Sequence, residues 1–161
     1  MQTRRTLAIR LRPVGEEDRG FTLAVFASTR ERERNAIAWT PGEWTRFIQT
    51  QFAAQCNHYA TFFPGSEHVV ILENETAVGR AWIYRCDLEI RLVDIAILRT
   101  HRSRGIGTHV IRSLQKEAAD AQLPVRHSVE LENPRARALY ERLGFVATET
   151  RGLHTLMEWN P

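Results

Sequence analysis

Residues 95–108 read Ile95-Ala96-Ile97-Leu98-Arg99-Thr100-His101-Arg102-Ser103-Arg104-Gly105-Ile106-Gly107-Thr108. Four apolar residues lead into a basic turn that contains two glycines. After Gly105, apolar residues recur four apart at positions 106, 110, 114 and 118, which is the spacing of one helical face. The stretch therefore predicts a buried strand, a turn, and an amphipathic helix that ends near residues 122–124.

The turn has the features of an anion-binding site. The first N–H groups of a helix lack partners within the helix, and the helix dipole adds positive potential there. Gly105 and Gly107 have no side chain, so a ligand can approach the main chain. A pyrophosphate would fit. The G-x-x-x-x-G-K-[ST] motif of P-loops is absent, and G-x-G without a third glycine is too short for the dinucleotide-binding fingerprint.

Strand and helix patterns alternate along the rest of the chain. Strands are predicted at residues 7–12, 68–72, 77–84, 89–98, 125–131, 145–150 and 155–159. One helix opens at Glu16-Glu17 and has a solvated charge run, residues 30–34, at its far end; a second extends from Pro41-Gly42 to Pro64-Gly65. Asn133-Pro134 caps a helix that runs to Leu143, with Gly144 as its stop. The order β-α-α-β-β-β-α-β-α-β-β predicts an α/β (α+β) fold with a mixed sheet.

Length and composition predict a single domain over residues 1–161. The chain has 161 residues, of which 43% are hydrophobic and 25% charged, and this is ordinary globular usage. Cys56 and Cys86 stand far apart without a C-x-x-C pair, which favours a reducing, cytoplasmic setting over a disulfide scaffold. No apolar run could span a bilayer, and residues 1–12 alternate charged with apolar residues rather than forming a signal core, so we expect no membrane partner.

The basic residues are almost all arginine. Of 22 lysines and arginines only Lys116 is a lysine, although the net charge is +3. Arginine pairs well with phosphate, so a nucleotide-bearing ligand and a nucleic acid are both allowed, as is a plain compositional bias. No aromatic-rich nucleic-acid motif is present, so nucleic acid is the least favoured partner. The six histidines show no H-x-x-x-H or H-E-x-x-H spacing, and we expect no metal site.

Two motifs resemble those of the GCN5-related N-acetyltransferase (GNAT) superfamily. The family writes its pyrophosphate loop Arg/Gln-x-x-Gly-x-Gly/Ala, which matches Arg102-Ser103-Arg104-Gly105-Ile106-Gly107. The second match is Asn133-Pro134-x-Ala136-x-Ala138-Leu139-Tyr140-Glu141-x-Leu143-Gly144-Phe145, at the expected distance downstream. The resemblance is close over residues 94–145 and weak before residue 60. It implies a mostly antiparallel, seven-stranded mixed sheet with helices on both faces and with strands 4 and 5 splayed apart.

The same resemblance implies where acetyl-CoA, the acetyl donor, would bind. The core for it would be residues 95–145, and the acceptor side would be the variable helices of residues 16–64. Pantetheine would enter between the strands at 89–98 and 125–131, where splayed strands leave main-chain groups unpaired. The expected contacts are the backbone near Ile97 and Leu98, the loop Arg102, Ser103, Arg104, Gly105, Ile106, Gly107 and Thr108, and Asn133 and Arg137 from the second motif. Arg99-Thr100 stand where the family often has proline, which affects the turn rather than the phosphate site.

Two residues are candidates for catalysis. By the resemblance Tyr140 is the general acid, since a phenol stays protonated at neutral pH and can donate to the departing sulfur. Its helical face would equally suit a core aromatic. Asp94 interrupts an apolar run, where burial would raise its pKa and make it a proton acceptor; a buried partner for an arginine is the equal alternative. The rival carboxylates are Glu89, Glu130 and Glu132, and Ser128 stands where one subgroup has its carboxylate.

The function implied is an acetyl-CoA-dependent N-acetyltransferase in which an amine attacks the thioester directly. The alternative is a non-catalytic, CoA-binding regulatory module. The acceptor would be an amine-bearing small molecule or protein, and the chain a monomer or homodimer. Five aromatic residues of the helical region are candidates for acceptor contact or for the core: Trp39, Trp44, Tyr59, Phe62 and Phe63.

Overall fold

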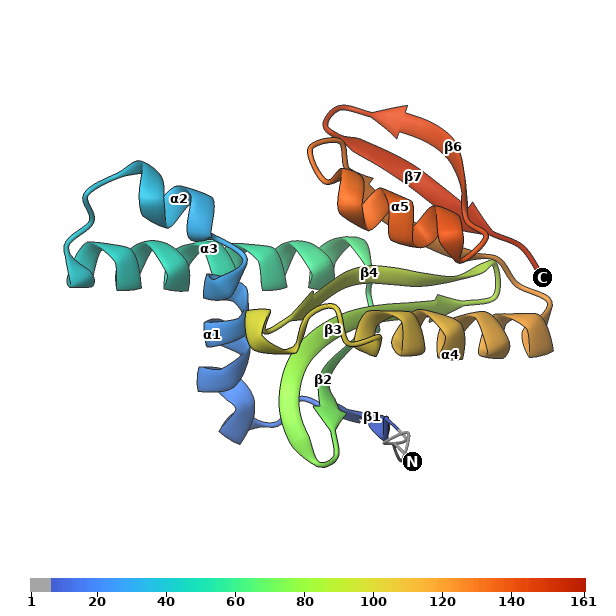
Figure 1. Ribbon diagram of the computed structural model, residues 1–161, viewed down its shortest axis with the longest axis horizontal. Coiled ribbons are helices and arrows are strands. Elements are labelled where there is room, and N and C mark those ends of the chain that lie inside the picture. The colour runs from blue at the N-terminus through green and yellow to red at the C-terminus, as the bar shows by residue number, and fades with distance from the viewer. Residues whose placement is uncertain (1–6) are drawn as a thin grey trace, which may run out of the picture.

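The computed structural model describes residues 7–161, so half of the N-terminal segment 1–12 discussed above lies outside it. Its strands are β1 Ile9–Pro13, β2 Glu67–Glu73, β3 Thr76–Cys86, β4 Glu89–Ile97, β5 Val125–Glu130, β6 Val146–Arg151 and β7 His154–Trp159 (Figure 1). Its helices are α1 Arg19–Ser28, α2 Glu31–Ala36, α3 Pro41–Phe62, α4 Ile106–Ala121 and α5 Pro134–Arg142, with single 3₁₀ turns at Glu16–Asp18 and Arg99–His101. Every strand predicted from the sequence is present within one or two residues.

The strands form one seven-stranded sheet in the order β1-β2-β3-β4-β5-β7-β6. All neighbours are antiparallel except β4 and β5, which are parallel. This confirms the mixed, mostly antiparallel sheet that the resemblance implies. In Figure 1, α5 and the β6–β7 ribbon lie at the opposite end of the molecule from α1 and β1.

The parallel strands β4 and β5 separate almost as soon as they meet. Only Ile90 with Val125 and Arg91 with Arg126 are paired. The register between β3 and β4 shifts between Trp82 and Ile83, which leaves Val93 as an extra residue on β4. Such a bulge increases the local twist and bends the strand. The expected splay between strands 4 and 5 is therefore present, and β4 beyond Arg91 has no paired strand on its β5 side.

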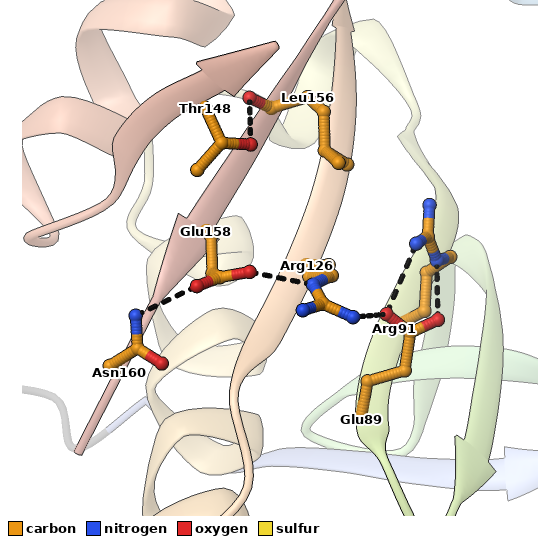
Figure 2. A network of polar contacts seen from close by, with 7 residues as sticks. All are labelled: Glu89, Arg91, Arg126, Thr148, Leu156, Glu158 and Asn160. Carbon is orange, nitrogen blue, oxygen red and sulfur yellow. Dashed lines mark hydrogen bonds and ion pairs between the residues drawn. The ribbon is translucent and has the colours of Figure 1, made fainter.

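A charged network fastens the closed end of this opening (Figure 2). Arg126 of β5 donates from Nη1 to Glu89 of β4 at 2.8 Å and from Nε to Glu158 of β7 at 2.7 Å. Arg91 donates to both carboxylate oxygens of Glu89, at 2.8 and 3.1 Å. Glu89 is buried, and its two arginine partners hold its pKa below the ordinary value despite that burial. Arg126 thus joins β5 to both β4 and β7 at the closed end, and Glu89, one of the rival acids, is held there by two arginines.

Helix α4 covers one face of the sheet with a single apolar stripe. Its buried residues are Ile106, Val110, Ile111, Leu114 and Ala118. They pack in one cluster with the inward residues of β2 to β5. Each large side chain buried in this way contributes about 2 kcal/mol of transfer free energy. Gln115 of α4 donates to the Leu143 carbonyl at the end of α5, at 2.7 Å, so α5 lies beside α4.

Helices α1 and α3 cover the other face. The Phe26 and Phe52 rings join them at a centroid distance of 5.2 Å, and Tyr59 of α3 packs on Trp82 of β3 at 5.5 Å. Helix α3 begins with a capping box: Thr40 Oγ1 accepts from the Glu43 N–H, and the Glu43 carboxylate accepts from the Thr40 N–H. Helices on both faces were expected.

The sequence predicts two helices between the first two strands, and that number is wrong. The structure has three, because the first predicted helix is broken into α1 and α2 before its charge run. At the break, Ser28 Oγ and Thr29 Oγ1 each donate to a carbonyl three residues back, at 2.7 Å. Such side-chain bonds compete with the main-chain helical bonds. The helix beginning at Asn133-Pro134 and ending at Gly144 is as predicted: Asn133 Oδ1 accepts from the Ala136 N–H, and Gly144 has φ +87°.

Among residues 7–161, no helix combines the length and the apolar character that crossing a membrane requires.

Candidate active site

The turn between β4 and α4 presents main-chain donors. Gly105 precedes α4 with φ +83° in the left-handed region, and apart from its chain neighbours no residue has a heavy atom within 4 Å of where a Cβ would stand. The first helical bond runs from the His109 N–H to the Gly105 carbonyl at 2.9 Å. Within the described chain, the N–H groups of Ile106, Gly107 and Thr108 therefore have no acceptor. Three donors beside an open glycine suit the pyrophosphate that the sequence predicts here.

The side chains of the turn are tied to neighbouring elements. Arg102 Nε donates to the Ile97 carbonyl at 2.8 Å, which closes the turn back onto β4. Arg104 Nη2 lies 3.0 Å from the buried Glu73 carboxylate at the end of β2. Ser103, with φ +62°, bonds through its hydroxyl to Arg135 at the start of α5. Arg102 and Arg104 thus fix the loop as well as supplying positive charge to it.

The main chain at the end of β4 is largely occupied. The Leu98 N–H donates to the Val78 carbonyl at 2.9 Å, and the Leu98 carbonyl accepts from the His101 N–H at 2.9 Å. The Leu98 N–H is therefore not free for a ligand, and a contact from Leu98 would come through its half-buried side chain. The edge of β4 before Ile97 faces the opening without a strand partner. That edge offers the main-chain groups a pantetheine arm would need.

Asn133 and Arg137 lie at the start of α5. Besides capping the helix, Asn133 leaves its amide nitrogen without a partner among residues 7–161. Arg137 Nε donates to Glu141 one turn further along at 2.9 Å, and its side chain is about half exposed. Among residues 7–161, neither side chain forms a hydrogen bond or ion pair with the turn, whereas that of Arg135 does.

Tyr140 lies on the inner face of α5 and is 2% exposed. Its ring stacks on His127 of β5 at a centroid distance of 4.5 Å and 23°, and meets Phe145 edge-on at 5.2 Å. Burial, and secondarily the negative charge of Asp94, raise the pKa of the phenol above its ordinary value. The phenol is therefore protonated throughout the working pH range. Tyr140 is therefore a core aromatic whose phenol stays protonated.

Asp94 lies on β4 just beyond the point where β5 diverges. Its Oδ2 is 3.0 Å from Nη2 of Arg80 on β3. Arg80 is almost wholly buried; its Nη2 also donates to Gln55 of α3 at 2.7 Å, and its guanidinium lies over the Phe52 ring. Burial raises the pKa of Asp94, and the charge of Arg80 opposes that rise. Asp94 is therefore an arginine partner with a raised pKa, and its role as proton acceptor stays a prediction.

The structure brings Tyr140 and Asp94 to the same opening from two different elements. Tyr140 belongs to α5 and Asp94 to β4, and the Asp94 charge acts on the Tyr140 phenol. A protonated phenol is a candidate proton donor, and a carboxylate of raised pKa is a candidate proton acceptor. The other rival acids are placed differently: Glu132 pairs with Arg32 of α2 at 2.6 Å, and Glu130 is exposed.

Only one of the five predicted acceptor-side aromatics lies next to this pair. Tyr59 packs on Trp82, which pairs with Asp94 across β3 and β4, and burial first and the Asp94 charge second raise the pKa of the Tyr59 phenol. Trp39 and Trp44 instead line a surface hollow of about 400 Å³ near the start of α3. Residues 44 and 59 are 15 positions apart in one helix, so that hollow lies about 20 Å away. Phe62 is exposed, and Phe63 packs on Tyr84.

Helix α2 connects both sides of the opening. Glu31 lies 3.3 Å from Arg99, which follows β4, and Arg32 lies 2.6 Å from Glu132, which follows β5. The charge run at residues 30–34, for which the sequence predicts only solvent exposure, therefore forms ion pairs with residues beyond the ends of both diverging strands. These pairs place α2 against the open end of the gap between β4 and β5.

Four residues of the site were not singled out from the sequence: Glu73, Arg80, His127 and Arg135. Arg80 stands in the otherwise apolar stretch of residues 77–83, and a charge expected to be buried there was the available signal. Glu73 and Arg135 are about 30 residues away from the loop in the sequence, and only the fold brings them next to it. No sequence pattern marks either residue.

The comparisons with known proteins agree with this geometry. Residues 25–145 match the model of the acetyltransferase (GNAT) family. A mycothiol acetyltransferase of Corynebacterium glutamicum (strain R) is 29% identical over 124 residues, which are 74% of this chain and 41% of that protein. An uncharacterized N-acetyltransferase of Bacillus subtilis (strain 168), YjcF, is 38% identical over 55 residues, 34% of this chain and 39% of that protein. The chain spans about two fifths of the length of these curated relatives.

A solved structure matches the fold over nearly its whole length. The PaiA N-acetyltransferase from Thermoplasma acidophilum, in complex with coenzyme A, superposes with a TM-score of 0.71 at 14% identity, covering 96% of this chain and 99% of that one. At that identity the likeness shows the fold alone. The family match, however, covers most of the chain and includes the turn, the opening and α5. The chain therefore belongs to the acetyltransferase (GNAT) family.

Proposed function

We propose that this protein is an acetyl-CoA-dependent N-acetyltransferase that transfers the acetyl group directly to an amine. The observation that carries the proposal is the opening between β4 and β5, with free main-chain donors of the α4 turn at one end and Tyr140 and Asp94 beside it. A thioester donor with a pyrophosphate needs both halves of this arrangement.

The turn would hold the donor. The N–H groups of Ile106, Gly107 and Thr108 would bind the pyrophosphate, with Arg102, Ser103 and Arg104 shaping the loop around Gly105. The unpaired edge of β4 up to Ile97 would bind the pantetheine, and Asn133 and Arg137 would contact the donor from α5. The donor supplies a thioester carbonyl that is open to attack.

Asp94 and Tyr140 would then move the protons. As the amine nitrogen bonds to the acetyl carbon, Asp94 accepts the proton that this nitrogen loses, directly or through a water. As the carbon–sulfur bond breaks, Tyr140 donates its proton to the departing sulfur. A proton passing from Asp94 back to Tyr140 restores both groups, so the overall count balances.

The acceptor is an amine-bearing small molecule or protein that enters past Tyr59 and α2. Nucleic acid is disfavoured because many arginines are already paired with carboxylates in the structure, Arg10, Arg12, Arg32, Arg80, Arg85, Arg91, Arg99, Arg104, Arg126, Arg137 and Arg151 among them. Cys56 and Cys86 are free thiols, which suits the cytoplasmic setting we propose.

A thiol-release screen tests the proposal. Acetyl-CoA is offered with a panel of amines: a peptide with a free N-terminus, a lysine peptide, a polyamine and an aminoglycoside. We expect CoA release with at least one class of amine, at a rate well above the rate without an amine. CoA binding without release from any amine would favour the regulatory module instead.

A further inference from the structure

His127 stands at the exact position where β4 and β5 part. The last paired residues are Arg91 and Arg126, so Leu92 and His127 come next on the two strands. No strand pairing is formed there; instead His127 Nδ1 lies 2.6 Å from the Leu92 carbonyl oxygen. A carbonyl only accepts, so Nδ1 carries the hydrogen of this bond. The side chain thus satisfies the first β4 carbonyl that β5 leaves behind.

The His127 ring is also the surface on which Tyr140 rests. The two rings stack at 4.5 Å and 23°, and Phe145 meets the Tyr140 ring edge-on at 5.2 Å. Within residues 7–161 the Tyr140 hydroxyl makes no hydrogen bond, so ring packing alone fixes where the phenol points. His127 is 9% exposed, and burial lowers its pKa to about 4, which keeps the imidazole neutral and able to make this single bond.

We propose that His127 is a positioning residue that sets the Tyr140 phenol relative to β4, through its bond to Leu92 and its stack on the phenol ring. The inference rests on the proposed role of Tyr140 as proton donor. The chain of contacts runs from Leu92 to His127 to Tyr140, and so links the strand beside the thioester to the acid on α5. An imidazole is suited to this because it combines a flat ring with a donor at Nδ1.

Two substitutions separate the two contacts. His127→Asn places an amide nitrogen near the Nδ1 position and keeps the bond to Leu92, but it has no ring. His127→Phe keeps a ring under Tyr140 but has no donor. His154→Asn, at an exposed site on the neighbouring strand β7, is the matched control. Thermal melting of each variant checks that it is folded.

Steady-state kinetics with an amine from the screen give the first readout. We expect His127→Asn to lower kcat at least tenfold and His127→Phe at least threefold. KM for acetyl-CoA should stay within threefold in both, and His154→Asn should match the wild type. In a Tyr140→Phe background, His127→Asn should lower kcat by less than twofold more, because it acts through the missing hydroxyl. A wild-type kcat in His127→Asn, or losses that multiply in the double variant, would overturn the proposal.

Tyrosine NMR gives a readout that does not depend on turnover. The chain has three tyrosines, so labelled tyrosine gives few signals, which Tyr→Phe variants assign. We expect slow flipping of the Tyr140 ring in the wild type and faster flipping in His127→Asn. If no amine is acetylated, the proposed function fails while this measurement still decides on His127. Equal ring dynamics in both proteins would refute the positioning role.

Discussion

The side chain of Asp94 is partly exposed, whereas that of its ion-pair partner Arg80 is buried. Oδ2 and Nη2 are 3.0 Å apart, yet the Arg80 side chain is 1% exposed and that of Asp94 25%. A buried charge of this kind is held by its partners, and removing one partner is costly. Arg80 therefore anchors Asp94 and also lowers its pKa against the effect of burial, and of the two side chains only that of Asp94 is partly exposed.

Asp94→Asn removes the proposed proton acceptor and keeps the size of the side chain. We expect kcat at pH 7 to fall by about 100-fold, as is common for loss of a general base. The loss should shrink as the pH passes the pKa of the amine, because the amine then arrives neutral. Rates measured from pH 6 to 10 check this. If Glu130→Gln, on the exposed side of β5, shows the loss and Asp94→Asn does not, the base is misassigned.

Arg80→Gln tests how Asp94 is tuned. The positive charge of Arg80 lowers the Asp94 pKa against the effect of burial, so removing it should raise that pKa further. Asp94 would then remain protonated to a higher pH, and the acid limb of the kcat profile should move to higher pH. Arg80→Lys keeps the charge and serves as the control. An acid limb that stays in place, or moves lower, in Arg80→Gln would contradict this account.

Tyr140→Phe removes one hydroxyl and keeps the ring packing on His127 and Phe145. We expect kcat to fall by about 100-fold, with KM for acetyl-CoA nearly unchanged, since the hydroxyl acts on the departing sulfur rather than on binding. Tyr84→Phe, on the opposite face of the sheet, is the control. An unchanged turnover would leave Tyr140 with a structural role only.

Asp18 predicts a pH dependence of stability. Its carboxylate accepts from Arg12 at 2.6 and 2.8 Å and from the Gly15 N–H at 2.8 Å. These bonds, the Arg12 pair first, lower its pKa from 3.8 to about 2. The folded pKa lies below the unfolded one, so the contribution is fully present above pH 4 and is lost as the pH falls toward 2. Melting temperatures of wild type and Asp18→Asn should differ at pH 7 and converge by pH 2. A constant difference would refute the assignment.

The local patterns of the sequence predicted most of the fold. The apolar spacing after Gly105 predicted α4, and the caps at Asn133 and Gly144 predicted α5, because each depends on neighbours along the chain. The break between α1 and α2 was missed because Ser28 and Thr29 are compatible with a helix until their bonds to the main chain are seen. The splay of β4 and β5 followed from the family resemblance and not from any residue pattern.

Some residues of the site could be predicted from the sequence and others could not. Gly105 and Tyr140 lie in motifs, so their surroundings could be expected. Arg80 and His127 act through partners from distant segments, Asp94 and Leu92 respectively, and only the fold brings these together. The roles of the donor-binding residues, and the single domain over residues 1–161, stay predictions.

The most direct test of the central claim is a calorimetric titration with acetyl-CoA of three proteins: wild type, Gly105→Val and Gly65→Val. Both glycines have left-handed φ, +83° and +80°, with open space at the Cβ position, but only Gly105 belongs to the α4 turn. The two substitutions should therefore strain the backbone alike. We predict one site per wild-type chain, similar affinity in Gly65→Val, and at least tenfold weaker binding in Gly105→Val. Absence of binding to the wild type, or equal binding by both variants, would contradict the account.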